Sequence, residues 1–192
     1  MTIKLNKIIV IDIEATCWEK NPPPDQESEI IEIGICIVDV ALAKPIEKES
    51  ILVRPERSQI SKFCTELTTL TQSEVDQGIT FSEACLKLRK KYESLQQVWA
   101  SWGEYDKNMF EKQCLSRGVK YPFGIRHINV KTLFALVHAL PKEVGMANAL
   151  KLLDIPLEGT HHRGADDAWN ISKILAKLLL QSRTISNPVK QL

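Results

Sequence analysis

The sequence has almost no excess of either charge. Its 25 basic and 24 acidic residues give a formal net charge of +1. A protein that coats long stretches of nucleic acid is usually more basic, because it must neutralise many phosphates. The composition therefore disfavours a broad nucleic-acid-binding surface, but it is compatible with binding a few nucleotides at the end of a strand.

Paired cysteines and long apolar runs are also missing. The five cysteines are scattered and form no C-x-x-C pair, so neither disulfides nor structural zinc are expected. No apolar run approaches the roughly 20 residues of a membrane span, and no N-terminal segment resembles a signal peptide. We therefore expect a cytoplasmic protein with reduced thiols that does not engage a membrane.

The hydrophobic pattern predicts an α/β chain. A capping box at Thr80–Glu83 predicts the start of a helix, and the proline-rich stretch at 21–28 predicts a loop. Strands followed by alternating helices and strands indicate a three-layer domain over 1–180 with a mixed central sheet flanked by helices, then a loose tail at 181–192. The strands are expected at 8–14, 30–40, 50–54, 98–102 and near 127, and the helices at 81–95, 104–117, 130–140, 146–153 and 165–180.

Two carboxylates interrupt the first apolar strand. Asp12 and Glu14 are two residues apart, so their side chains point to the same face. Adjacent carboxylates in a poorly solvated place repel each other, and their pKa values rise. A hard divalent cation such as Mg²⁺ would remove that conflict, because it prefers oxygen ligands. The alternative is that both acids lie just past the strand end and are solvated.

Two later stretches carry further candidate residues. Asp106 falls in the first turn of a predicted helix, and His162 stands five residues before Asp167, where the last helix begins. Taken singly, each residue has a simpler explanation. Acids are common at helix starts because they complement the helix dipole, and a histidine in a loop is usually only solvated. Together with the D-x-E pair they form a specific ordered pattern. His161 and Asp166 have the same spacing, so the register of the pair stays open.

With this pattern the sequence resembles the DEDDh 3′–5′ exonucleases, most closely the branch of the histone-mRNA and siRNA-trimming 3′ exoribonuclease. The resemblance runs from about residue 8 to about residue 178, and it implies an RNase H-like fold and two-metal phosphodiester hydrolysis. It rests on the stretches VIDIEATCWE, SEIIEIG, VRPE, ISKFCTELTTLTQSEVD, WGEYDKNMF, YPFGIRHINVKTLF and GTHHRGADDAWNISKI.

The resemblance also implies roles for five residues. Asp12, Glu14, Asp106 and Asp167 would hold two divalent cations, Mg²⁺ or Mn²⁺, with Asp106 bound directly or through water. His162 would be the general base, since the alignment of HRGADDAWNI favours it, with Asp167, over the preceding histidine and its aspartate.

A pocket for the terminal nucleotide is expected next to these residues. The backbone of Ala15 and Thr16 would contact the sugar, and Phe63 and Tyr105 would stack on the base. The alternative for Phe63 is a core position. Trp99 and Trp102 are predicted to be core residues, and the pocket wall is expected from Thr65, Glu66 and Leu67.

The function implied is a metal-dependent 3′–5′ exonuclease domain that hydrolyses single-stranded RNA from its 3′ end to nucleoside 5′-monophosphates, with DNA as the other substrate. Two classes remain as alternatives. A catalytically silent nucleic-acid-binding module would lack an acid or the histidine, and a mononucleotide phosphatase would lack the stacking positions at Phe63 and Tyr105.

Overall fold

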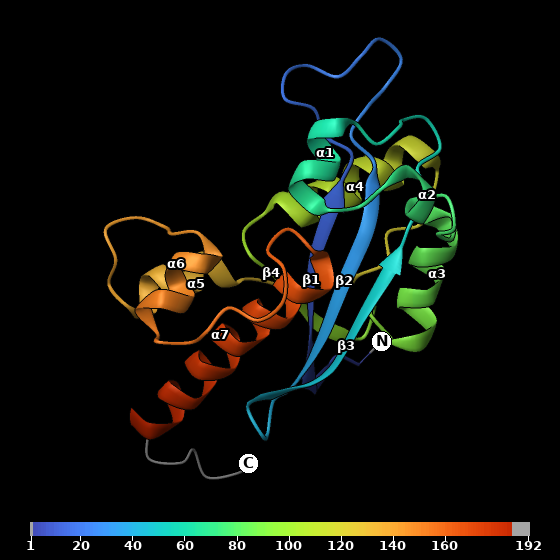
Figure 1. Ribbon diagram of the computed structural model, residues 1–192. Helices are drawn as coiled ribbons and strands as arrows, with labels where there is room; N and C mark the ends of the chain where they lie inside the picture. The colour runs from blue at the N-terminus through green and yellow to red at the C-terminus, as the bar shows by residue number, and fades with distance from the viewer. Residues whose placement is uncertain (1, 186–192) are drawn as a thin grey trace.

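The computed structural model describes residues 2–185 (Figure 1). Within this range one sheet has the strand order β3-β2-β1-β4-β5. Strands β1 and β2 are antiparallel, as are β2 and β3, whereas β1–β4 and β4–β5 are parallel. The sheet is therefore mixed, as the sequence predicts. Its strands are β1 (Lys4–Ala15), β2 (Ile30–Asp39), β3 (Lys44–Leu52), β4 (Gln97–Ser101) and β5 (His127–Asn129).

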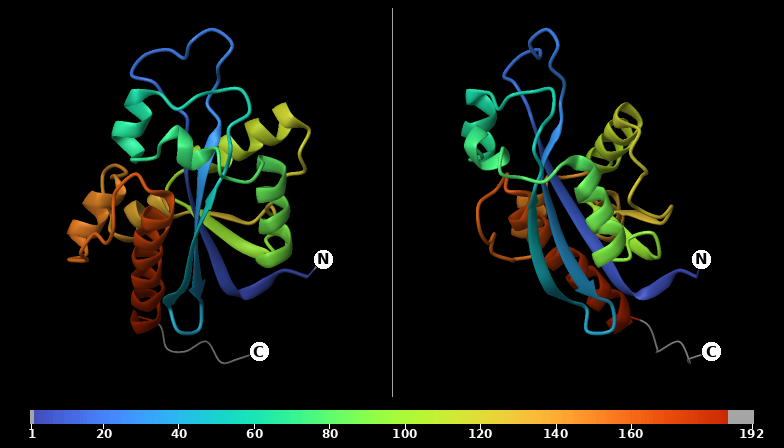
Figure 2. Two further views of the ribbon diagram at one scale, coloured as in Figure 1. Left: turned by 45° about the vertical axis from the view of Figure 1, so that its right-hand side comes forward. Right: turned by 90° about the vertical axis from the view of Figure 1, so that its right-hand side faces the viewer.

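Helices lie on both faces of this sheet (Figure 2). The capping box predicted at Thr80–Glu83 is present at the start of α3. Helices α1 and α2 were not predicted, because they are short and isolated helices of that length are unstable without packing. The helices are α1 (Lys62–Thr68), α2 (Gln72–Val75), α3 (Phe81–Lys91), α4 (Tyr105–Arg117), α5 (Val130–Val137), α6 (Met146–Leu152) and α7 (Gly164–Ile185).

Alternation along β1 divides the core into two layers. Ile9 and Ile11 belong to the cluster that contains Phe81 of α3 and Phe110 of α4. Ile8 and Val10, on the opposite face of the strand, pack instead against α5, α6 and α7. The predicted three-layer α/β architecture is therefore confirmed. Because side chains alternate across a strand, the next even-numbered residues of β1 must face α7, and these are the two carboxylates.

The start of α7 rests directly on the sheet. A Cβ atom on Gly34 of β2 would lie 1.8 Å from the carbonyl carbon of Gly164, the first residue of α7. A Cβ on Gly164 would in turn lie 2.9 Å from the carbonyl oxygen of Asp12. Two glycines thus permit a backbone approach that no other residue allows. The contact brings the loop before α7 next to the end of β1.

Several boundaries differ from the predictions. Strand β1 begins at Lys4 rather than at residue 8, and α5 ends at Val137 rather than at residue 140. Strand β3 begins at Lys44 rather than near residue 50, because its polar first half pairs with β2. The helix expected over 81–95 ends at Lys91. Helix α7 continues to Ile185, so residues 181–185 are not a loose tail, and the rest of that predicted tail, 186–192, lies outside the described residues. Among the helices described, none combines the length and apolar character that a membrane-spanning segment requires.

Candidate active site

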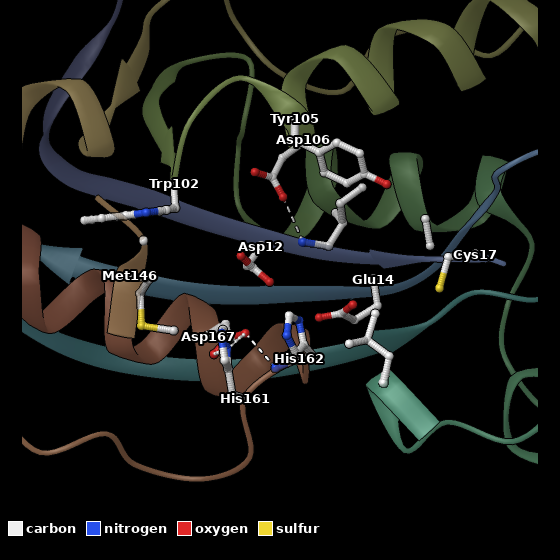
Figure 3. Close-up of a pocket in the computed structure, with 14 residues that line it drawn as sticks. Asp12, Glu14, Cys17, Trp102, Tyr105, Asp106, Met146, His161, His162 and Asp167 are labelled. Atoms are coloured by element: carbon white, nitrogen blue, oxygen red, sulfur yellow. Dashed lines mark hydrogen bonds and ion pairs between the residues drawn. The ribbon is translucent and has the colours of Figure 1, made fainter. Parts of the chain in front are cut away.

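A cavity of about 410 Å³ opens where β1, α4 and α7 meet (Figure 3). It collects residues from five separate stretches of the chain, so no local pattern could delimit it. Its lining consists of Asp12, Ile13, Glu14, Ala15, Cys17, Leu67, Trp102, Tyr105, Asp106, Gly145, Met146, His161, His162 and Asp167.

The two β1 carboxylates face this cavity from the sheet. Burial raises the pKa of Asp12 well above its usual value, and the nearby charges of Asp106 and Asp167 raise it further. Burial, followed by the charges of Asp167 and Glu32, raises the pKa of Glu14 to about 8. Glu14 is only 8% exposed, which excludes the alternative that it is a solvated residue past the strand end. Crowded acids of this kind must take up protons or bind a cation.

Asp106 approaches from the other side, on the first turn of α4. Its Oδ1 accepts a hydrogen bond of 2.9 Å from the backbone N–H of Ile13. Strand β4 pairs with β1 only as far as Val10, so this amide lies beyond the end of that ladder. Asp106 therefore replaces a strand partner for β1, and burial raises its pKa to about 7.

The first turn of α7 supplies Asp167, and the loop before it supplies two histidines. Asp167 is 4% exposed, and its Oδ2 accepts a 2.9 Å hydrogen bond from the backbone N–H of His162. His161 Nδ1 lies 2.9 Å from the same oxygen. Burial raises the pKa of Asp167. Burial, and then the charge of His161, lowers the pKa of His162, so its imidazole is neutral at pH 7.

Asp166 points away from the cavity. It forms an ion pair with Lys48 of β3, and its Oδ2 accepts a 2.7 Å hydrogen bond from the backbone N–H of Thr160. Burial raises the pKa of Asp166, but the Lys48 and Thr160 hydrogen bonds outweigh it and the net shift is downward. Of the two adjacent aspartates, the structure thus brings Asp167 to the β1 acids and leaves Asp166 in a peripheral ion pair.

The donor set suits a hard divalent cation. One oxygen each of Asp12, Glu14 and Asp167 lie within 4.8 Å of one another. Carboxylate oxygens are the ligands that Mg²⁺ and Mn²⁺ prefer. The pKa values of Asp12 and Glu14 are raised first by burial and then by the charges of neighbouring carboxylates, and a bound cation would relieve that repulsion. Asp106 lines the same cavity but is not part of this close group.

Only part of the expected nucleotide pocket lines the cavity. Ala15, Leu67 and Tyr105 do, and Tyr105 is 57% exposed, as a stacking surface requires. Thr16 does not, because its backbone N–H donates to Glu29 O and its C=O accepts from Ser28 Oγ, both at 2.8 Å.

The rest of the expected wall lies on α1, outside the cavity lining. Phe63 is 38% exposed and is not a core residue. Glu66 is exposed and pairs with Lys62 at 3.5 Å. Thr65 accepts the backbone N–H of Thr69 through its carbonyl, at 2.8 Å. Helix α1 thus presents Leu67 to the cavity and the other three residues elsewhere.

Sequence reasoning missed Glu32 of β2. It pairs directly across the sheet from Glu14 and is 1% exposed. Its Oε2 accepts hydrogen bonds from Gly164 N at 3.0 Å and from Arg163 Nε at 3.2 Å. Glu32 therefore holds the loop that carries the histidines. The signal is present in the sequence, because an acid inside an apolar strand is the same anomaly that identifies the first two carboxylates.

Trp102 and Met146 were also missed as cavity residues. Trp102 was predicted to be core, and it does donate Nε1–H to Val144 O at 3.2 Å, yet it also lines the cavity. Trp99, by contrast, is 1% exposed, as expected for a core residue. Cys17 lies at the opposite end, and its pKa is raised to about 12 by burial and by the Cys64 thiol, which excludes a thiolate nucleophile at neutral pH.

The sheet is mixed and carries carboxylates at the end of its first strand. A further acid lies in the first turn of the last helix, and a histidine lies just before that helix. This arrangement is the scaffold of RNase H-like exonucleases. This is the class that the fold and the cavity define. The exonuclease family profile (RNase_T) matches residues 9–175, so the chain belongs to that family.

Individual relatives agree with this assignment. A human protein named 3′-5′ exoribonuclease 1 is 31% identical over 182 residues, covering 90% of this chain and 52% of the relative. The 3′-5′ exonuclease Snipper of Drosophila melanogaster is 28% identical, covering 90% of this chain and 69% of its own length. The chain thus spans about half the length of the human relative.

Solved structures show the same fold. The nuclease domain of 3′hExo, described as a DEDDh family member bound to rAMP, has a TM-score of 0.79 at 29% identity, with 92% of each chain covered. A structure described as 3′-end-specific recognition of a histone mRNA stem-loop by a 3′-exonuclease has a TM-score of 0.83 at 29% identity, covering 94% of this chain and 65% of the other. The RNase H-like fold implied by the sequence is therefore confirmed.

Proposed function

We propose that this chain is a metal-dependent 3′–5′ exonuclease of the DEDDh type, which removes nucleoside 5′-monophosphates from the 3′ end of single-stranded RNA. The observation that carries the proposal is the convergence of Asp12, Glu14, Asp106, His162 and Asp167 on one cavity. These five residues come from three distant parts of the sequence. Their meeting point is open at the surface, where the end of a strand can enter.

The four acids would hold two divalent cations, which stabilise charge on the attacking and leaving oxygens during in-line displacement at phosphorus. Asp12, Glu14 and Asp167 form the tight group, and Asp106 faces Asp12 across the cavity (Figure 3). The Ile13 amide fixes the Asp106 carboxylate at 2.9 Å, and the His162 amide fixes that of Asp167 at the same distance. Both side chains are thus oriented before substrate arrives.

His162 is the residue suited to take the proton from the attacking water. Its lowered pKa keeps the imidazole neutral at pH 7, which is the form that accepts a proton. Its ring lines the same cavity as Glu14 (Figure 3). The loop that carries it is anchored at both sides, by Asp167 and by Glu32, so the ring is held close to the acids.

The terminal nucleotide would occupy the end of the cavity lined by Ala15, Leu67 and Tyr105. Stacking of a base on an aromatic face contributes about 1–3 kcal/mol and tolerates any base. A second apolar wall, formed by Trp102 and Met146, lies at the other end of the cavity, beyond Asp12 (Figure 3). A strand that crosses the acids would therefore meet apolar surface on both sides of the scissile phosphate.

RNA is the favoured substrate because of the relatives. The human relative is named an exoribonuclease, and the 3′hExo domain was solved with rAMP. The Drosophila relative is named only an exonuclease, so DNA is the comparison substrate in the test.

The test uses matched 5′-labelled single-stranded RNA and DNA oligonucleotides with Mg²⁺ or Mn²⁺. The expected result is a ladder that shortens from the 3′ end, released nucleoside 5′-monophosphates, and faster loss of RNA. A 3′-phosphate should block the reaction, and Glu14→Gln is the inactive control. Efficient cleavage of a circular RNA would contradict the exonuclease assignment.

The same assay, with a free nucleoside monophosphate tested alongside the oligonucleotide, separates the two alternatives. A silent binding module would retain the oligonucleotide without shortening it. A mononucleotide phosphatase would release inorganic phosphate from free nucleoside monophosphates and leave the oligonucleotide intact.

A further inference from the structure

Two adjacent histidines form a second ligand set at the edge of the cavity. The rings of His161 and His162 are stacked, with centroids 4.1 Å apart and planes 17° apart. His161 Nδ1 lies 2.9 Å from Asp167 Oδ2 and 3.1 Å from Oδ1. One nitrogen of each ring and one Asp167 oxygen all lie within 4.8 Å of one another.

The backbone conformation explains why the side chains of His161 and His162 point to the same side of the chain. Adjacent side chains in an extended chain point in opposite directions. His162 instead has a φ of 65°, in the left-handed region, and this turn of the chain brings the two rings together. Glu32 holds Arg163 and Gly164 on one side of the rings, and Asp166 holds the Thr160 amide on the other. The ring pair is therefore fixed next to Asp167 by its surroundings.

This set has a different metal preference from the three carboxylates. Mg²⁺ favours oxygen ligands in octahedral geometry, whereas Zn²⁺ readily takes imidazole nitrogen and carboxylate oxygen in a four-coordinate site. Zinc–ligand distances of about 2.0–2.2 Å require small rotations of the donor side chains. The His161 side chain is 44% exposed, so it has room for that rotation and offers an entry route for the ion.

We propose that His161, His162 and Asp167 form an inhibitory transition-metal site for which Zn²⁺ is the fitting ion. The inhibitory role rests on the proposed function. Zinc bound to His162 occupies the nitrogen lone pair that the reaction needs for a proton. Zinc bound to Asp167 withdraws that carboxylate from the Mg²⁺ group, because Asp167 belongs to both sets. Zinc therefore acts on the proposed base and on a shared metal ligand together.

The activity test measures Mg²⁺-supported cleavage of single-stranded RNA at increasing zinc concentration. The key variant is His161→Asn, whose amide still hydrogen-bonds Asp167 but is a poor zinc ligand, and its inhibition is measured relative to its own rate without zinc. Its half-inhibitory zinc concentration should rise by at least about tenfold, since loss of even an outer-shell partner costs 10–100-fold in metal affinity. His138→Asn, a histidine outside the cavity lining, is the matched control and should be inhibited normally.

The binding test uses calorimetric titration of the metal-free full chain with ZnCl₂ alone. The unmodified chain should bind one ion more tightly than either His161→Asn or His162→Asn. If zinc inhibits and binds His161→Asn as strongly as the unmodified chain, the ion acts on the carboxylates alone and the inference is wrong. If binding requires both histidines but the chain cleaves no nucleic acid, the metal site stands and the proposed function fails.

Discussion

Glu14→Gln tests the electrostatic cost of the candidate site. The amide has the shape of the carboxylate but cannot ionise. The pKa of Glu14 is raised from 4.5 to about 8, so the folded chain holds this proton while the unfolded chain releases it. The stability that this proton contributes is complete below pH 4.5 and is lost as the pH rises through about 8. Each pH unit above 4.5 lowers the free energy of unfolding of the metal-free chain by about 1.36 kcal/mol, so roughly 3 kcal/mol is lost by pH 7.

The assay is urea unfolding in excess EDTA between pH 4 and pH 8. Glu14→Gln should be more stable than the unmodified chain at pH 7, by up to about 3 kcal/mol, and the difference should shrink as the pH falls toward 4.5. Added Mg²⁺ should stabilise the unmodified chain more than the variant. Glu66→Gln, at an exposed site, should change stability by no more than about 0.5 kcal/mol. A variant that is less stable at every pH would refute the reasoning.

Three further outcomes are expected. His162→Ala should lose about 10²–10⁴ in turnover with little change in RNA binding. In the unmodified chain the rate should rise with pH around a midpoint below the ordinary histidine pKa of 6.5, and this rise should disappear in the variant. An unchanged pH profile would show that another group is the base. Tyr105→Ala should weaken binding of single-stranded RNA by about 1–3 kcal/mol in a fluorescence anisotropy titration, whereas unchanged affinity would place the base elsewhere. Gly34→Ala should displace the start of α7, because its Cβ would lie 1.8 Å from Gly164, and the variant should lose both nuclease activity and thermal stability; wild-type values for both would contradict the packing argument.

The β1 part of the site could be predicted from residue spacing and side-chain type. Asp12 and Glu14 share a face because strand geometry alternates, and this holds wherever the strand lies. Glu32 follows the same rule and could have been found in the same way. The position of Asp106 and of the histidine–aspartate pair came from resemblance, since nothing local distinguishes a helix-start acid in a cavity from one in water.

The sequence by itself determined the strands, the capped helix α3, and the even-numbered face of β1 that carries the acids. Those features depend on contacts between residues a few positions apart, which spacing and side-chain type record. Only the tertiary structure decided that Asp167 faces Asp12 while Asp166 pairs with Lys48, and that the helix carrying Leu67 forms at all. These outcomes depend on how closely α7 approaches the sheet at Gly34 and on packing that stabilises a helix too short to persist alone. Contacts between distant segments set both, and no short stretch of sequence contains them.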